Sequence, residues 1–152
     1  MKFYLVRHGE AVSQAVNGQR PLTPWGRRNV ERIGRAAADR GVQPDQIFHS
    51  GLLRAQQTAE ILSESLGRLA GVRELVGLRP DDDPAVAKAE LESSPISLML
   101  VGHLPHMSRL TSFLLSGDAD RDPVEFAPAT VIGLSYEDYR WTMLWKLTAT
   151  TP

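Results

Sequence analysis

Apolar residues along the chain form short continuous runs, separated by segments in which they recur at every third or fourth position. Residues 3–6 and 96–101 are such runs, and residues 46–49 contain a shorter one. Runs of this length that end at polar residues are typical of buried β-strands. The 96–101 run is the most apolar segment of the chain, so we expect it to form a central strand that is covered on both faces.

The segments between these runs carry start and stop signals of α-helices. Thr23-Pro24 and Asp83-Pro84 each combine an N-cap residue with a proline at the first helical position. Gly41, Gly67 and Gly117 follow the last periodic residues of three segments, where a left-handed glycine commonly ends a helix. The predicted helices are residues 24–40, 53–66, 84–93 and 105–116.

Two further strands, residues 131–136 and 140–148, are predicted at the C-terminal end, and they are expected to form an antiparallel hairpin. In the second strand, apolar residues occupy every second position, at Trp141, Met143, Trp145 and Leu147. The preceding alternation of strands and helices favours a mainly parallel sheet. We therefore predict an α/β fold: a single-domain three-layer α/β/α arrangement whose mainly parallel sheet carries an antiparallel edge strand or hairpin at the C-terminus.

Composition narrows the function classes. The chain has 152 residues, of which 42% are hydrophobic and none is cysteine, so chemistry that needs a thiol is excluded. No repeat or linker divides the chain, and residues 1–152 are expected to form a single domain. The net charge of −1 predicts no nucleic-acid or membrane partner. The first residues are too weakly apolar for a signal peptide, and a cytoplasmic location is expected.

Polar residues with related chemistry follow three of the predicted strands. Arg7-His8-Gly9 follows the first, His49-Ser50 with Arg54 follows the second, and Gly102-His103 follows the 96–101 run. Ligands of open α/β sheets bind beyond the carboxyl ends of the strands. The topology therefore predicts that Arg7, His8, Arg54 and His103 converge on one site.

These residue types suit phosphoryl transfer. A guanidinium pairs with phosphate oxygens through two hydrogen bonds, so Arg7 and Arg54 are predicted to hold a phosphoryl group. Positive neighbours disfavour a protonated imidazole, which leaves His8 as a neutral nucleophile that forms a phosphohistidine intermediate. His103 is predicted to donate a hydrogen bond to the equatorial oxygens, and no metal or other cofactor is required. Arg20, in the loop after the first strand, is predicted to contact phosphate or substrate from the rim.

Each of these residues also has an ordinary structural interpretation. Arg54 fits a helix-surface ion pair, His8 fits a turn, and His103 fits the start of a helix. The coincidence of residue type and position at three strand ends, flanked by Gly9 and Gly102, favours the functional interpretation.

Other conspicuous residues carry weaker signals. The carboxylates of residues 81–83 do not share a face, so they predict no metal site. His106 has no apparent partner ligands and is expected to lie exposed near the mouth of the pocket. The three tryptophans are expected to serve packing.

The motifs resemble a known family. Arg7-His8-Gly9-Glu10, directly after an N-terminal strand, resembles the defining motif of the histidine phosphatase superfamily, also called the phosphoglycerate mutase-like family. Segments 22–26, 50–59 and 101–103 follow in the family's order. Residues 20–23 and 102–105, together with the short chain, are similar to the SixA group of bacterial phosphohistidine phosphatases. The resemblance implies that residues 1–152 form a single histidine phosphatase-like domain and that His8 is the phosphorylated nucleophile.

The resemblance further implies that Arg7, Arg54 and His103 complete the phosphate pocket, which phosphate or sulfate can occupy. Two departures stand out. Gly51 occupies a position where many members have proline, and this change is expected to alter only the entrance to the helix. The acidic proton donor of larger members has no clear counterpart, with Glu74 as a candidate whose ordinary interpretation is a solvated surface residue.

The missing acid bears on the substrate. An alkoxide is a poor leaving group unless an acid protonates it, whereas imidazole, with a pKa of about 6.5, is expelled more easily. We therefore predict a metal-independent phosphatase that acts on phosphohistidine in a partner protein through phospho-His8. Two alternatives are open: a phosphomonoesterase for a small phosphate ester that uses Glu74 or water as acid, and a non-catalytic phosphate-binding module.

Overall fold

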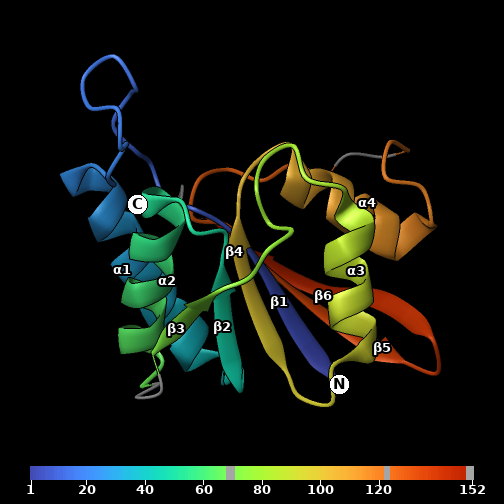
Figure 1. Cartoon of the computed structure of the whole chain (residues 1–152). Coiled ribbons are helices and arrows are strands. Elements are labelled where there is room, and N and C mark those ends of the chain that lie inside the picture. Colours follow the sequence, from blue (N-terminus) through green and yellow to red (C-terminus); the bar gives the residue numbers. More distant parts are fainter. Residues whose placement is uncertain (68–70, 122–123, 150–152) are drawn as a thin grey trace.

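The computed structural model describes residues 1–67, 71–121 and 124–149, and it forms strands and helices in the predicted order (Figure 1). The elements are β1 (Lys2–Arg7), α1 (Pro24–Asp39), β2 (Gln46–His49), α2 (Leu53–Ser65), β3 (Val72–Glu74), α3 (Pro84–Ser93), β4 (Leu98–Gly102), α4 (His106–Ser116), β5 (Val131–Glu137) and β6 (Arg140–Leu147).

One sheet contains all the strands, in the order β3-β2-β4-β1-β5-β6. The first four of these are mutually parallel, whereas β5 runs antiparallel to β1 and β6 antiparallel to β5. The predicted mainly parallel sheet with a C-terminal antiparallel hairpin is confirmed. All five residues of β4 are buried, as expected for a central strand.

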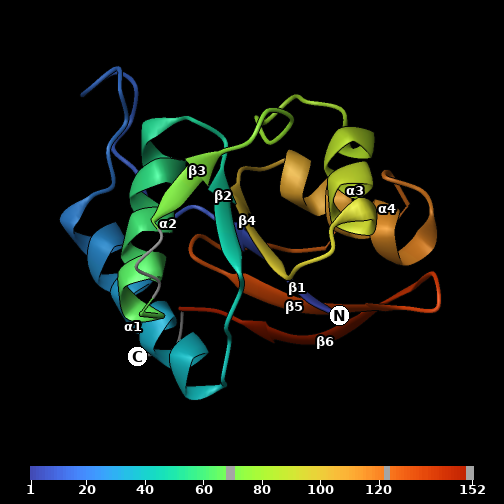
Figure 2. The same cartoon turned by 60° about the horizontal axis from the view of Figure 1, so that its bottom comes forward.

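Helices cover both faces of the sheet, with α1 and α2 on one face and α3 and α4 on the other (Figures 1 and 2). Because side chains alternate along a strand, β1 contributes to both cores. Tyr4 and Val6 pack in the core beneath α1 and α2, and Phe3 and Leu5 pack in the core beneath α3 and α4. The three-layer α/β/α prediction is confirmed. None of the helices in the described part of the chain is long and apolar enough to cross a membrane.

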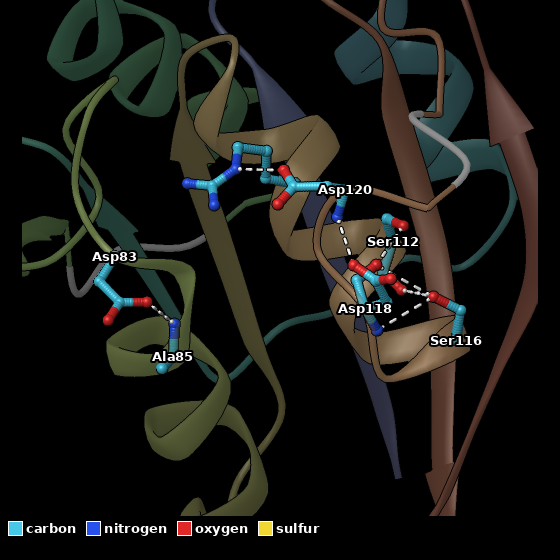
Figure 3. A network of polar contacts seen from close by, with 7 residues as sticks. Asp83, Ala85, Ser112, Ser116, Asp118 and Asp120 are labelled. Carbon is cyan, nitrogen blue, oxygen red and sulfur yellow. Dashed lines mark hydrogen bonds and ion pairs between the residues drawn. The ribbon is translucent and has the colours of Figure 1, made fainter.

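The predicted helix ends are explained by local hydrogen bonds. The hydroxyl of Thr23 accepts from the amide of Gly26 at 2.9 Å, and Asp83 accepts from the amide of Ala85 at 2.9 Å (Figure 3). Gly41 and Gly117 both adopt a left-handed conformation with φ of 79°. These interactions satisfy backbone groups that the helix itself leaves unpaired.

The structure corrects one strand boundary and adds one strand that was not predicted. β4 begins at Leu98 rather than at residue 96, because the hydroxyl of Ser94 bonds both the amide and the carbonyl of Ile96 and holds this residue in a turn. The short strand β3 was not predicted, since Val72-Arg73-Glu74 has little apolar character. It forms because β2 offers a free edge to this segment. There Val72 pairs with Ile47 of β2.

The edge strand β6 also departs from simple alternation. A register shift places Trp145 opposite Gly133 and Met143 opposite the next residue, Leu134. This bulge turns the apolar side chains of β6 to different faces of the sheet. Trp141 and Met143 pack against the core under α3 and α4, whereas Trp145 and Leu147 pack against the other core.

Candidate active site

The carboxyl ends of β1 and β4 bring the two motif histidines together. Arg7 pairs with Gly102 across these parallel strands, and the amide of His8 donates to the carbonyl of Gly102 at 3.0 Å. The imidazole centroids of His8 and His103 lie 5.0 Å apart. The predicted convergence of the first and third strand ends is therefore present.

His8 has the protonation state and tautomer of a nucleophile. Its Nδ1 lies 2.6 Å from the carbonyl oxygen of Gly9. A carbonyl only accepts hydrogen bonds, so Nδ1 carries the proton and Nε2 holds the free lone pair. Burial, with smaller contributions from the positive charges of Arg54, Arg7 and Arg20, lowers the pKa of His8 to about 4. Burial thus contributes more to the neutral ring than the arginines on which the sequence argument relied.

His103 is also buried and neutral. Burial lowers the pKa of its imidazole to about 3, with smaller contributions from His8 and Arg54. Its Nε2 lies 2.6 Å from the hydroxyl oxygen of Ser50. Its Nδ1 is buried and has no hydrogen-bond partner among the described residues. His103 is therefore able to donate at most one hydrogen bond, from one ring nitrogen.

Within the described residues, the two arginines form no ion pair with a carboxylate. Nη1 of Arg7 donates to the carbonyl of Phe126 at 2.8 Å. The ion pairs within residues 1–67, 71–121 and 124–149 involve neither Arg7 nor Arg54, and the Nε atoms of both are buried without a partner there. The alternative interpretation of Arg54 as a member of a surface ion pair finds no support, and both charges remain available for an anion.

Arg20 lies at the base of the loop that connects β1 to α1. Its Nε donates to the carbonyl of Val12 at 3.0 Å, and the amide of Val12 donates to the carbonyl of Pro21 at 2.8 Å. Its positive charge contributes to lowering the pKa of His8, Arg54 and His103. This electrostatic influence fits the predicted position of Arg20 at the rim of the pocket.

A residue that the sequence argument did not single out connects the first two motifs. The hydroxyl of Thr58, which is fully buried in α2, accepts from the amide of Gly9 at 3.1 Å and donates to the carbonyl of Arg54 at 2.8 Å. Both backbone groups of Gly9 are thus hydrogen-bonded, because its carbonyl also accepts from Nδ1 of His8. The signal available in the sequence was the position of Thr58 within the 50–59 motif, one helical turn after Arg54.

The turn after β2 explains the departure at Gly51. This residue has a φ of 90°, which proline cannot adopt, and its amide donates to Nδ1 of His49 at 3.0 Å. The carboxylate of Glu74 lies directly over its α-carbon, where a Cβ would collide with Oε1. The change from proline therefore alters more than a helix entrance, since it accommodates a side chain from β3.

Glu74 is placed beside this turn and not beside the nucleophile. Burial lowers the pKa of the neighbouring His49, and the negative charge of Glu74 opposes part of this shift. It is not among the charges that shift the pKa of His8 or His103. A role for Glu74 as the acid that protonates a leaving group therefore gains no support from the structure.

Two other expectations need correction. His106 is fully buried and not exposed at the pocket mouth, because α4 begins at this residue and turns its side chain into the protein. Burial lowers the pKa of its imidazole, and a backbone contact with Gly77 acts in the opposite direction. Trp25 is 52% exposed, with the guanidinium of Arg28 5.8 Å from its ring centroid, so it contributes less to packing than expected. No group of three potential metal ligands occurs in the part of the chain that the structure describes.

Fold and motif geometry agree with the family comparison. Residues 3–79 match the model of the histidine phosphatase superfamily (branch 1), and the chain belongs to this family. The similar proteins include an uncharacterised protein of Picosynechococcus sp., which is 32% identical over 142 residues, covering 88% of this chain and 84% of that protein.

Phosphohistidine phosphatase SixA of Escherichia coli is 24% identical over 153 residues, covering 94% of this chain and 93% of its own. Among solved structures, the protein histidine phosphatase SixA complexed with tungstate has a TM-score of 0.87 at 24% identity, covering 98% of this chain and 97% of that one. The putative SixA of Agrobacterium tumefaciens has a TM-score of 0.82 at 23% identity, with 97% of each chain covered. The predicted family and fold are confirmed.

Proposed function

We propose that this protein is a metal-independent phosphatase that removes phosphate from phosphohistidine in a partner protein, with His8 as the covalent nucleophile. The observation that carries the proposal is the combination of a lone pair on Nε2 of His8 with the guanidinium groups of Arg7 and Arg54, which form no ion pair with the carboxylates of the described residues. The two guanidinium groups are suited to bind a tetrahedral phosphoryl anion, and the imidazole lone pair is suited to attack its phosphorus atom.

The reaction proceeds in two displacements. Nε2 of His8 attacks phosphorus, a bond from phosphorus to Nε2 forms, and the bond to the substrate's imidazole nitrogen breaks. Arg7 and Arg54 balance the charge on the equatorial oxygens, and His103 donates a hydrogen bond to them. Water then attacks the phospho-His8, inorganic phosphate leaves, and His8 returns to its starting state.

The choice of phosphohistidine rests on the leaving group. A substrate imidazole whose other nitrogen is protonated leaves as a neutral molecule and needs no strong acid. The candidate acid Glu74 lies at the Gly51 turn, which disfavours alcohol esters as substrates. The similarity to proteins named phosphohistidine phosphatase along nearly the whole chain also supports this substrate.

An open surface next to the pocket supports a protein as the substrate. A groove of about 440 Å³ is lined by Leu104, which follows His103, and by Phe126, whose carbonyl holds Arg7; its other lining residues are Ser108, Val124, Glu125 and Ala127. A histidine carried on a folded partner has room to approach beside this groove. We further propose that phosphate or sulfate occupies the pocket, since a SixA structure holds tungstate, and that the protein acts in the cytoplasm.

A labelling experiment tests the nucleophile. Wild-type protein, His8→Ala and the control His106→Leu are incubated with a ³²P-labelled phosphohistidine protein in the presence of a chelator. We expect label on wild type and on the control, labile in acid and stable in base, and none on His8→Ala. Label that survives the loss of His8 refutes the assignment.

Substrate comparison separates the proposed activity from the alternatives. Turnover of the phosphohistidine protein is measured beside a panel of small phosphate esters. Higher kcat/KM for an ester than for any phosphohistidine substrate would favour the phosphomonoesterase. Binding of the phosphoprotein without label transfer or phosphate release would favour a binding module.

A further inference from the structure

The hydrogen-bonding state of His103 is not determined by its own position in the motif. A neutral imidazole has one N–H donor and one lone pair, so His103 helps a phosphoryl oxygen only if its free nitrogen carries the proton. The partner of the other nitrogen determines which tautomer forms. In this protein that partner is the hydroxyl of Ser50, 2.6 Å from Nε2.

The surroundings of Ser50 determine the direction of this hydrogen bond. Ser50 is 2% exposed, and its oxygen accepts a hydrogen bond from the amide of Leu52 at 3.3 Å. If Nε2 of His103 also donated to this oxygen, the buried hydroxyl proton would have no acceptor among the hydrogen bonds that Ser50 makes within the described residues. An unsatisfied buried donor of this kind is unfavourable, because it loses its hydrogen bond to water and gains none in return. The hydroxyl proton is instead satisfied when it points at Nε2.

The backbone at this turn holds Ser50 in place. The following residue, Gly51, has a φ of 90°, and its amide is held by Nδ1 of His49 at 3.0 Å. Ser50 immediately follows β2, in which His49 pairs with Val101 of the neighbouring strand β4. The hydroxyl therefore belongs to the rigid sheet edge that also supports His103, and it does not depend on a mobile loop.

We propose that Ser50 is a positioning residue that donates to Nε2 of His103 and thereby places the proton of that imidazole on Nδ1, as the donor to a phosphoryl oxygen. The buried Nδ1 of His103, which has no partner among the described residues, then has a ligand that satisfies it. In the opposite tautomer Nδ1 would present a lone pair, which repels an oxyanion. The catalytic part of this inference rests on the proposed phosphatase function.

The direct test is the tautomer of His103. Long-range ¹H–¹⁵N spectra of the wild-type protein, with His103 assigned by its loss in His103→Asn, are expected to show a protonated Nδ1 and an unprotonated Nε2. A protonated Nε2 overturns the proposal. This measurement requires no substrate, so it remains decisive for Ser50 even if the protein has no phosphatase activity.

Variants of Ser50 test the consequence for catalysis. Ser50→Ala removes the hydroxyl, Ser50→Thr keeps it, and Ser112→Ala removes an equally buried hydroxyl that bonds the carbonyl of Asp118 at the far end of α4 (Figure 3). We expect Ser50→Ala to lower kcat for a phosphohistidine protein by about 10- to 100-fold and to shift the His103 tautomer. Ser50→Thr is expected to recover most of the rate, and Ser112→Ala to change only the melting temperature.

The outcomes separate this inference from the proposed function. Loss of rate in Ser50→Ala with an unchanged Nδ1–H tautomer would show a merely structural role and overturn the proposal, as would a wild-type rate in that variant. Absence of phosphohistidine turnover in the wild-type protein would refute the proposed function alone, leaving the tautomer measurement as the test of Ser50.

Discussion

Acidification provides a sensitive test of the site, because we expect His8 to remain neutral well below the pH at which an ordinary histidine is protonated. The ring is 8% exposed, and burial, aided by Arg54, Arg7 and Arg20, lowers its pKa from 6.5 to about 4. This change corresponds to about 3 kcal/mol in favour of the neutral ring. At pH 5 about a tenth of His8 is then protonated, against roughly 97% of a histidine with the ordinary pKa.

The assay is a titration of the imidazole carbons by ¹H–¹³C NMR between pH 3.5 and 8. The chain has four histidines, so His8 is assigned by the one signal missing in His8→Ala. The pH dependence of kcat/KM should give the same pKa. Protonation of the nucleophile His8 should lower kcat/KM only near pH 4. Arg54→Met should raise the pKa of His8, but by less than the whole shift, because burial is the largest cause.

A His8 pKa near 6.5 in the native protein would refute the reasoning. It would mean that water reaches the ring freely, or that a carboxylate balances the arginines. In either case His8 would be mostly charged in mildly acidic conditions, and its lone pair would not be available for attack on phosphorus.

Three further outcomes follow from the same contacts. The free energy of unfolding, measured by denaturant titration, should decrease as pH falls from about 6.5 toward 4. The pKa values of His8 and His103 are depressed in the folded protein, so the unfolded chain binds more protons in this range. A flat profile, with no contribution from these histidines, would contradict their burial. Gly51→Ala should lower the melting temperature and cost about 1–3 kcal/mol, because of its φ of 90° and the overlying Glu74, whereas Gly18→Ala, with open space around it, should be close to neutral; equal effects would show that the turn is not constrained. Thr58→Val should cost about 1–3 kcal/mol in unfolding and lower kcat, since the buried amide of Gly9 loses its acceptor. Thr58→Ser should keep most of the stability and of the rate, and full activity in the valine variant would exclude Thr58 from alignment of the motifs.

Much of the fold could be predicted from local sequence. The proline-initiated helices at residues 24 and 84, and the left-handed glycines at residues 41 and 117, are set by interactions within a few residues. The strand β3 could not be predicted in this way, because Val72 to Glu74 become a strand only by pairing with β2. The bulge in β6 likewise depends on the partner strand β5.

The catalytic candidates were accessible from the sequence because three strand ends carried the same chemistry. Arg7 ends β1, and His8 and His103 directly follow the parallel strands β1 and β4, so that strand direction alone places these residues at one edge of the sheet. The partners of these residues were not accessible. Ser50 and Thr58 act through single hydrogen bonds to residues 53 and 49 positions away, and no local pattern encodes such a contact.

Residue types, their order and the periodicity of apolar positions were thus sufficient for the α/β fold, for the family and for the candidate nucleophile. Burial, tautomers and unpaired charges required the folded chain, because they depend on which distant groups come within a few ångströms of one another. His106 illustrates the difference. Its sequence position beside the pocket motif suggested exposure, whereas the packing of α4 against the sheet removes it entirely from solvent.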